Sequence, residues 1–170
     1  MLPMEFVDGD ATAPQVDGNK IIAHVCNDIG AWGAGIVRVI SCRWPEPERE
    51  FRAWHRDRAT TGYRLGAVQL VKVEPTLWVA NMVGQHGIRT REGIRTESGT
   101  DPADSGPAIR YDAVRECLHV LAEHAEGLHA SVHMPRIGCG LAGGTWDRVE
   151  PLITQALCAR HIRTIVYDHV

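Results

Sequence analysis

The sequence predicts an α/β fold in one domain over residues 1–170, and three observations support this prediction. Apolar runs of strand length alternate along the chain with segments whose apolar residues recur at helical spacing. The length of 170 residues and the hydrophobic fraction of 44% suit one compact core. The chain contains no internal repeat, low-complexity tract or long linker that would divide it into two domains.

The N-terminal half is predicted to contain four strands and two helical segments. Pro45 and Pro47 are expected to break the first helical segment, and the second begins with acidic residues near its start. The turn at Glu74-Pro75 joins two strands that are expected to pair. The predicted strands cover residues 4–12, 19–27, 65–73 and 76–84, and the helical segments cover 36–44 and 48–59.

The C-terminal half begins with residues 85–106, a polar, glycine-rich segment without an apolar face, which is predicted to be a mobile surface loop. The following helix is expected to close at Gly127, and Pro151 is expected to break or delay the last helix. Two helices are predicted over 109–127 and 145–161, and two strands over 129–138 and 162–170.

Composition and charge exclude several classes of protein. The net charge of −3 and the scattered basic residues argue against a nucleic-acid partner. No apolar run reaches the length of a membrane span, so no membrane partner is expected. The N-terminus lacks the pattern of a secretory signal, and the five cysteines form no C-x-x-C pair, so reduced thiols and a cytoplasmic location are expected.

The histidines do not predict a metal site. His119, His124 and His129 are the best candidates, but steps of five residues do not keep them on one helical face. No metal or organic cofactor is therefore expected.

Two glycine-rich segments, DIGAWGAG over 28–35 and IGCGLAGG over 137–144, each follow an apolar strand and precede a helix. Glycines let the backbone approach an anion, and the following helix N-terminus favours negative charge. Neither segment has the lysine of a P-loop, and the G-x-G-x-x-G in the second lies near the end of the chain rather than in a first strand–helix unit. Spacing alone leaves a structural turn and a phosphate loop as alternatives.

Three segments in this order, VDGDAT, AHVCNDIGAWGAGI and MPRIGCGLAGGTW, resemble the macro domain family over nearly the whole chain. The resemblance is greatest to the branch containing the terminal ADP-ribose protein glycohydrolase and the yeast-type ADP-ribose 1″-phosphate phosphatase. It implies a three-layer α/β/α fold with a mixed central sheet and an ADP-ribose crevice at the top of the sheet. The implied partners are ADP-ribose or mono-ADP-ribosylated proteins.

The resemblance also implies the binding residues. Asp10 matches the acid that accepts a hydrogen bond from the adenine amino group, although an aspartate after Gly9 is also common in turns. Asn27 matches a polar residue near the distal ribose. The other implied ligand-binding residues are Ala11, Gly33, Ala34, Gly35, Ile36, Arg136, Ile137, Gly138, Cys139, Gly140, Leu141, Ala142, Gly143 and Gly144.

Three further residues have two interpretations each. His24 either shapes the distal pocket or is a hydrogen-bonded core histidine, and the second interpretation is preferred. Tyr167 either borders the adenine or packs in the core. Trp32 either forms a wall of the crevice or packs its loop against the sheet.

The mechanism expected for this chain differs from that of the glycohydrolase branch. That branch has a nucleophilic lysine after the fourth strand, where this chain has Gly84 and Gln85, and an aspartate where this chain has Ala142. A Schiff base is therefore not expected, because no lysine amine is present at that position. A water positioned by the ligand's own phosphate and by Asn27, Gln85 or His86 is the expected nucleophile, with Asp28 considered as a base or as a turn residue.

Three functions remain open on the sequence. The preferred one is hydrolysis of mono-ADP-ribose from acidic side chains of proteins. A non-catalytic ADP-ribose reader is the second, and an ADP-ribose 1″-phosphate phosphatase is the third.

Overall fold

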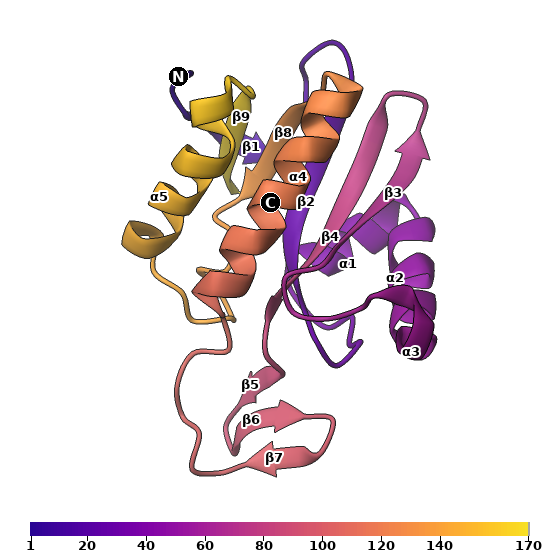
Figure 1. Ribbon diagram of the computed structural model, residues 1–170, viewed down its shortest axis with the longest axis vertical. Coiled ribbons are helices and arrows are strands. Elements are labelled where there is room, and N and C mark those ends of the chain that lie inside the picture. The colour runs from indigo at the N-terminus through magenta and orange to yellow at the C-terminus, as the bar shows by residue number, and fades with distance from the viewer. Residues whose placement is uncertain (170) are drawn as a thin grey trace.

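A six-stranded mixed sheet forms the centre of the computed structural model, which describes residues 1–169 (Figure 1). The strands are β1 (Glu5–Asp10), β2 (Lys20–Asn27), β3 (Val68–Glu74), β4 (Leu77–Gln85), β8 (Ser131–Pro135) and β9 (Thr164–His169). Their order across the sheet is β1-β9-β8-β2-β4-β3. Strands β1, β9, β8, β2 and β4 are parallel, and β3 pairs antiparallel with β4. The predicted pairing of these two strands is confirmed.

Helices cover both faces of this sheet and make the three layers that the resemblance implied (Figure 1). The helices are α1 (Ile36–Arg43), α2 (Glu46–Arg56), α3 (Arg58–Thr61), α4 (Tyr111–Leu128) and α5 (Trp146–Ala156), followed by the short 3-10 helix η1 (Cys158–Arg160). The core side chains of α4 and α5 pack on one face, and those of α1 and α2 pack on the other. The α/β prediction is therefore confirmed.

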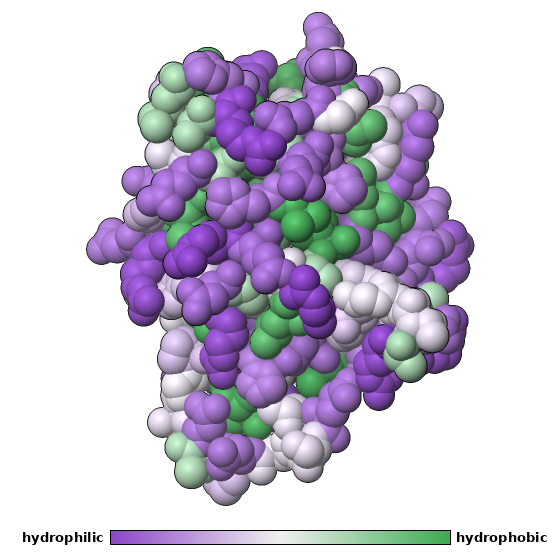
Figure 2. All heavy atoms as spheres, viewed as in Figure 1, coloured by the Kyte–Doolittle hydropathy of each residue, from purple (hydrophilic) through white to green (hydrophobic). Residues whose placement is uncertain are grey.

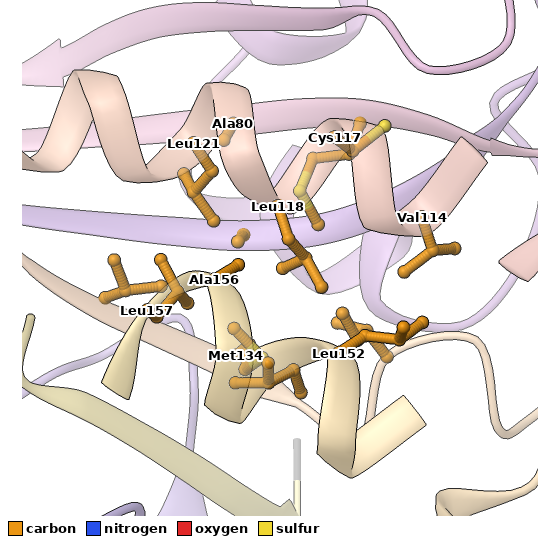
Figure 3. Close-up of a cluster of buried hydrophobic side chains, with 14 of the residues drawn as sticks. Ala80, Val114, Cys117, Leu118, Leu121, Met134, Leu152, Ala156 and Leu157 are labelled. Carbon is orange, nitrogen blue, oxygen red and sulfur yellow. The ribbon is translucent and has the colours of Figure 1, made fainter. Parts of the chain in front are cut away.

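The larger core lies between α4, α5 and the sheet (Figure 3). Helix α4 directs Leu118 and Leu121 into this core, where they meet Leu152 of α5 and Met134 of β8. Leu118, Leu121 and Met134 are inaccessible to solvent, because the helical spacing places the leucines on one stripe. Each buried leucine contributes about 1.5–3 kcal/mol to folding.

Strand β2 is buried on both faces, because it lies in the middle of the sheet. Ile21 and Ala23 belong to the core under α4, whereas Ile22 belongs to a second core with Ile40 and Trp44 of the α1 layer. This explains why residues 21–26 are apolar apart from His24, as is typical of parallel strands with helices on both sides.

The segment 85–106 differs from its prediction. It contains a small antiparallel sheet of β5 (Ile88–Thr90), β6 (Gly93–Thr96) and β7 (Gly99–Asp101), which projects beyond the end of β4 (Figure 1). Ile94 is 1% exposed within it. The prediction of a surface loop missed these strands because they have three or four residues each, too few to show an alternating pattern. We call residues 87–106 the meander.

Three helix boundaries also differ from the predictions. Helix α2 begins at Glu46, because Pro47 in the first turn has no need of an N–H group. Helix α4 passes through Gly127 and ends at Leu128, and His129 takes the left-handed conformation with φ 51°. Helix α5 runs without a break through Pro151, so the predicted break is wrong; packing of its buried apolar stripe outweighs one lost backbone bond.

The face covered by α4 and α5 is mainly hydrophilic, with hydrophobic residues in small separate areas (Figure 2). Among the helices of residues 1–169, none is long and apolar enough to cross a membrane.

Candidate functional site

The carboxyl ends of the five parallel strands meet at one edge of the sheet, and the predicted site residues follow one another along that edge. Asp10 ends β1, Arg136 follows β8, Asn27 ends β2 and Gln85 ends β4. Four strand spacings separate β1 from β4, about 19 Å at about 4.8 Å each. Ligands of open α/β sheets bind at this edge.

A cleft of about 440 Å³ lies between the two glycine loops at this edge. Its lining residues are His24, Val25, Ala34, Gly35, Ile36, Val39, Gln85, Pro135, Arg136, Ile137, Gly138, Gly140, Leu141 and Ala142. The tertiary structure therefore brings ten of the predicted site residues together. The apolar residues Val25, Val39 and Pro135 are additions that the sequence did not single out, because they resemble any other core position.

The glycines of the second loop are required for different reasons. A Cβ atom at Gly144 would lie 2.5 Å from the carbonyl oxygen of Gly138, and one at Gly138 would lie 2.3 Å from Cδ1 of Ile109. These two glycines are required by packing inside the protein. A Cβ atom at Gly140 would meet no atom within 4 Å, and the same is true at Gly33 of the first loop.

Backbone N–H groups are available around the cleft. Helix α1 begins at Ile36 beside the cleft, and no side chain caps its N-terminus. Within residues 1–169, no hydrogen bond uses the N–H groups of Gly140, Leu141 or Ala142. Amides at a helix N-terminus and in a glycine loop form a favourable environment for an anion.

Arg136 is the cation of the cleft, and three elements hold it in place. Its Nε donates to Oδ1 of Asp168 at 2.7 Å, and its guanidinium carbon lies 5.3 Å from the Phe6 ring centre and 4.8 Å from that of Trp146. These contacts use β1, β9 and α5 to fix the orientation of the guanidinium.

Asp10 is engaged within the protein and does not line the cleft. Its Oδ1 accepts hydrogen bonds from the N–H group and the hydroxyl of Thr12, and its Oδ2 pairs with Arg43 at 3.1 Å. Partial burial raises the pKa of the Asp10 carboxyl, but the bonds from Thr12 and Arg43 outweigh it and hold the pKa below its usual value. The turn interpretation thus describes Asp10 in this structure, and its contact with adenine stays a prediction.

Asn27 shapes the first loop rather than facing the cleft. Its Oδ1 accepts from the N–H groups of Ile29 and Ala31, and its Nδ2 donates to the carbonyl of Ala31. The Tyr63 hydroxyl donates to the Asn27 carbonyl at 2.6 Å and accepts from Gly30. Tyr63 was not predicted, since nothing in the sequence connects it to a loop more than thirty residues away.

Gln85 and His86, neighbours in the sequence, lie in different hollows. Gln85 lines the cleft, and its Nε2 donates to the Gly87 carbonyl at 2.9 Å. His86 lines a second hollow of about 290 Å³ together with Asp28, Ile29 and the residues Thr96, Glu97 and Ser98 of the meander. The remaining predicted residues outside the cleft lining are Ala11, Gly33, Cys139, Gly143 and Gly144.

His24 is a hydrogen-bonded core histidine, as preferred from the sequence. It is inaccessible to solvent, and its Nε2 lies 2.6 Å from Oδ1 of Asn81. Burial lowers the pKa of His24 to about 4, against the opposing effect of the Asn81 bond. The imidazole is therefore neutral at pH 7 and packs beneath the cleft.

Tyr167 and Trp32 are also placed by packing. The Tyr167 hydroxyl lies 2.7 Å from Nδ1 of His133, and the tyrosine is buried in the core beside Ala11. Trp32 contacts the His24 ring at 5.4 Å between ring centres and donates from Nε1 to the Ser41 hydroxyl. Trp32 therefore packs its loop against the sheet.

Comparison with known proteins identifies the family. The chain matches no family model. A macrodomain protein from Streptomyces coelicolor is 52% identical, and the match covers 99% of this chain and 100% of that protein with a TM-score of 0.83. An ADP-ribose 1″-phosphate phosphatase of Candida albicans is 23% identical over 89% of this chain and 92% of the relative.

A chromodomain-helicase-DNA-binding protein 1-like of Danio rerio is 30% identical over 96% of this chain, yet this chain spans only 15% of that relative's length. The Streptomyces coelicolor protein matches over essentially the full length of both chains. On that identity and coverage, the chain belongs to the macrodomain family.

Proposed function

We propose that this macrodomain, as a single domain over residues 1–170, binds ADP-ribose in the cleft and hydrolyses mono-ADP-ribose from acidic side chains of modified proteins. The environment of Gly140 carries the proposal. Neither a steric neighbour nor a left-handed φ requires glycine at this position. The close approach of a phosphate to the loop backbone supplies the requirement.

The order of the residues along the sheet edge suits the order of groups in ADP-ribose. Asp10 at β1 serves the adenine, the two loops and Arg136 serve the diphosphate, and Gln85 at β4 serves the distal ribose. The relative from Candida albicans, named for a phosphatase of ADP-ribose 1″-phosphate, acts on a derivative of the same compound.

The proposed reaction uses a water molecule at the anomeric carbon of the distal ribose. The ligand's phosphate and the Gln85 amide hold this water, and the bond from Gln85 to Gly87 leaves Oε1 of Gln85 as an acceptor. The water oxygen bonds to the anomeric carbon while the bond to the ester oxygen breaks. The acidic side chain leaves as a carboxylate, which is a good leaving group, and the water gives up one proton as it becomes the new hydroxyl group.

A non-catalytic ADP-ribose reader is the second candidate, and two observations favour it. The lysine and the aspartate of the glycohydrolase branch are replaced at Gly84-Gln85 and at Ala142, and the Asn27 amide is engaged inside its own loop. A reader needs only a binding cleft, and the two glycine loops that flank the cleft support this candidate.

Incubation with a protein labelled with ADP-ribose on glutamate separates these candidates. We expect release of the label as ADP-ribose, and loss of release in the triple variant Asn27→Ala, Gln85→Ala, His86→Ala. Retention of the label at high protein concentration, together with ADP-ribose binding by calorimetry, would establish the reader. Absence of binding heat would remove both candidates.

We further propose that the protein works in the cytoplasm. Its five cysteines are free thiols, and Cys26, Cys117 and Cys158 are buried. Unpaired thiols of this kind suit a reducing compartment.

A further inference from the structure

Asp28 and His86 form a close hydrogen-bonded pair beside the cleft. Nδ1 of His86 lies 2.7 Å from Oδ2 of Asp28, and Oδ1 of Asp28 accepts from the N–H group of Gly87 at 2.7 Å. The Asp28 side chain is 17% exposed and that of His86 is 39% exposed. The carboxylate is thus shielded and fully oriented, while the imidazole remains open to solvent.

The backbone on both sides of this pair is also held. The N–H group of Asp28 donates to the Gln85 carbonyl at 3.0 Å, and the N–H group of His86 donates to the Ala108 carbonyl at 2.8 Å. Asp28 follows β2 and His86 follows β4, and these strands are neighbours in the sheet. The imidazole is therefore fixed one residue beyond Gln85, which lines the cleft, and His86 itself lines the second hollow.

A bond from Nδ1–H to a carboxylate fixes the tautomer of a histidine. The lone pair is then on Nε2, and no hydrogen bond within residues 1–169 uses that atom. Bases of this form accept a proton from water, and the carboxylate stabilises the imidazolium that results.

We propose that His86 is the general base of the hydrolysis and that Asp28 is its positioning residue. This inference rests on the proposed function. Nε2 takes a proton from the attacking water as the water oxygen bonds to the anomeric carbon and the ester oxygen leaves with its electron pair. The proton then passes from the imidazolium to solvent, so the reaction yields ADP-ribose, the free carboxylate and one proton.

The charged groups around His86 come from three elements. Asp28 faces it from the first loop, and Glu97 faces it from the meander across the same hollow. Glu97 is itself paired with His55 and Arg58 from the α2 and α3 region, with 2.6 Å between His55 Nε2 and Glu97 Oε1. The short Asp28 bond is therefore the one that sets the orientation of His86.

Single-turnover release of ADP-ribose from the glutamate-labelled protein tests the catalytic part. We expect His86→Ala to lower the rate about 10²–10⁴-fold with unchanged ADP-ribose affinity, and free imidazole to restore part of the rate. His119→Ala, at an exposed histidine of α4, is the matched control and retains the wild-type rate. An active wild type whose rate is unchanged in His86→Ala overturns the inference and leaves the proposed function standing.

The positioning part has a readout that does not need activity. Nitrogen chemical shifts of the His86 ring report its tautomer, and we expect the proton on Nδ1 in the wild type and a mixture in Asp28→Asn. We also expect Asp28→Asn to lower the rate without rescue by imidazole. A wild-type His86 with the proton on Nε2 overturns the assignment of Asp28, and a wild type that releases no label overturns the proposed function and the base together.

Discussion

Substitution of Gly140 by glutamate tests the proposed diphosphate site most directly. Gly140 is exposed on the second loop, lines the cleft, and has open space where a Cβ atom would project. The change therefore leaves the fold intact and introduces bulk and negative charge where the ligand is expected. We expect ADP-ribose binding to be lost while thermal unfolding is unchanged.

The expected loss of affinity follows from the repulsion between the introduced carboxylate and a ligand phosphate. Two unit charges 4 Å apart at an effective dielectric constant of 20 repel with about 4 kcal/mol. This corresponds to about a thousandfold loss of affinity, and steric exclusion from the loop adds to it. A micromolar ligand then falls to the millimolar range, below detection by ordinary titration.

Calorimetric titration with ADP-ribose measures the effect, and two variants serve as controls. Gly140→Ala adds bulk without charge and is expected to show an intermediate loss. Gly127→Glu adds the same charge on α4, where a Cβ atom also has open space, and is expected to bind as the wild type does. An affinity of Gly140→Glu within tenfold of the wild type would refute the assignment of this loop to the diphosphate.

Three further predictions concern selectivity and stability. Asp10→Ala is expected to reduce the preference for ADP-ribose over its inosine analogue more than it reduces affinity for the diphosphate, as competition titrations would reveal; equal loss for both compounds contradicts the adenine contact. Gly144→Ala is expected to lower the free energy of unfolding by about 1–3 kcal/mol in urea, because its Cβ atom would lie 2.5 Å from the Gly138 carbonyl oxygen. The pKa of His24 is lowered by burial to about 4 from 6.5, so the folded state favours neutral His24. The contribution of neutral His24 to the free energy of unfolding is complete above pH 6.5. It falls by about 3 kcal/mol as the pH is lowered from 6.5 to 4. His24→Gln should show a smaller loss of unfolding free energy over this pH range than the wild type, and an identical pH dependence would show that His24 is not the group responsible.

The strands and the large helices could be predicted from the sequence because their signals are local. Ile21–Val25 is a mainly apolar run of strand length, and Val114–Leu121 shows the helical period. The meander escaped prediction because its three-residue and four-residue strands are stabilised by pairing with one another rather than by their own pattern. The predicted helix break at Pro151 was wrong because the packing of α5 outweighs one missing backbone hydrogen bond.

The sequence by itself determined the α/β class, the two glycine loops and the family resemblance, since each depends on residue types in a fixed order along the chain. Only the tertiary structure decided which glycines are required by internal packing, that the Asn27 amide is engaged in its own loop, and that Asp28 meets His86. Asp28 and His86 are 58 residues apart, and parallel pairing of β2 with β4 brings them together. Contacts of this kind depend on strand order and register, which no local pattern of residues encodes.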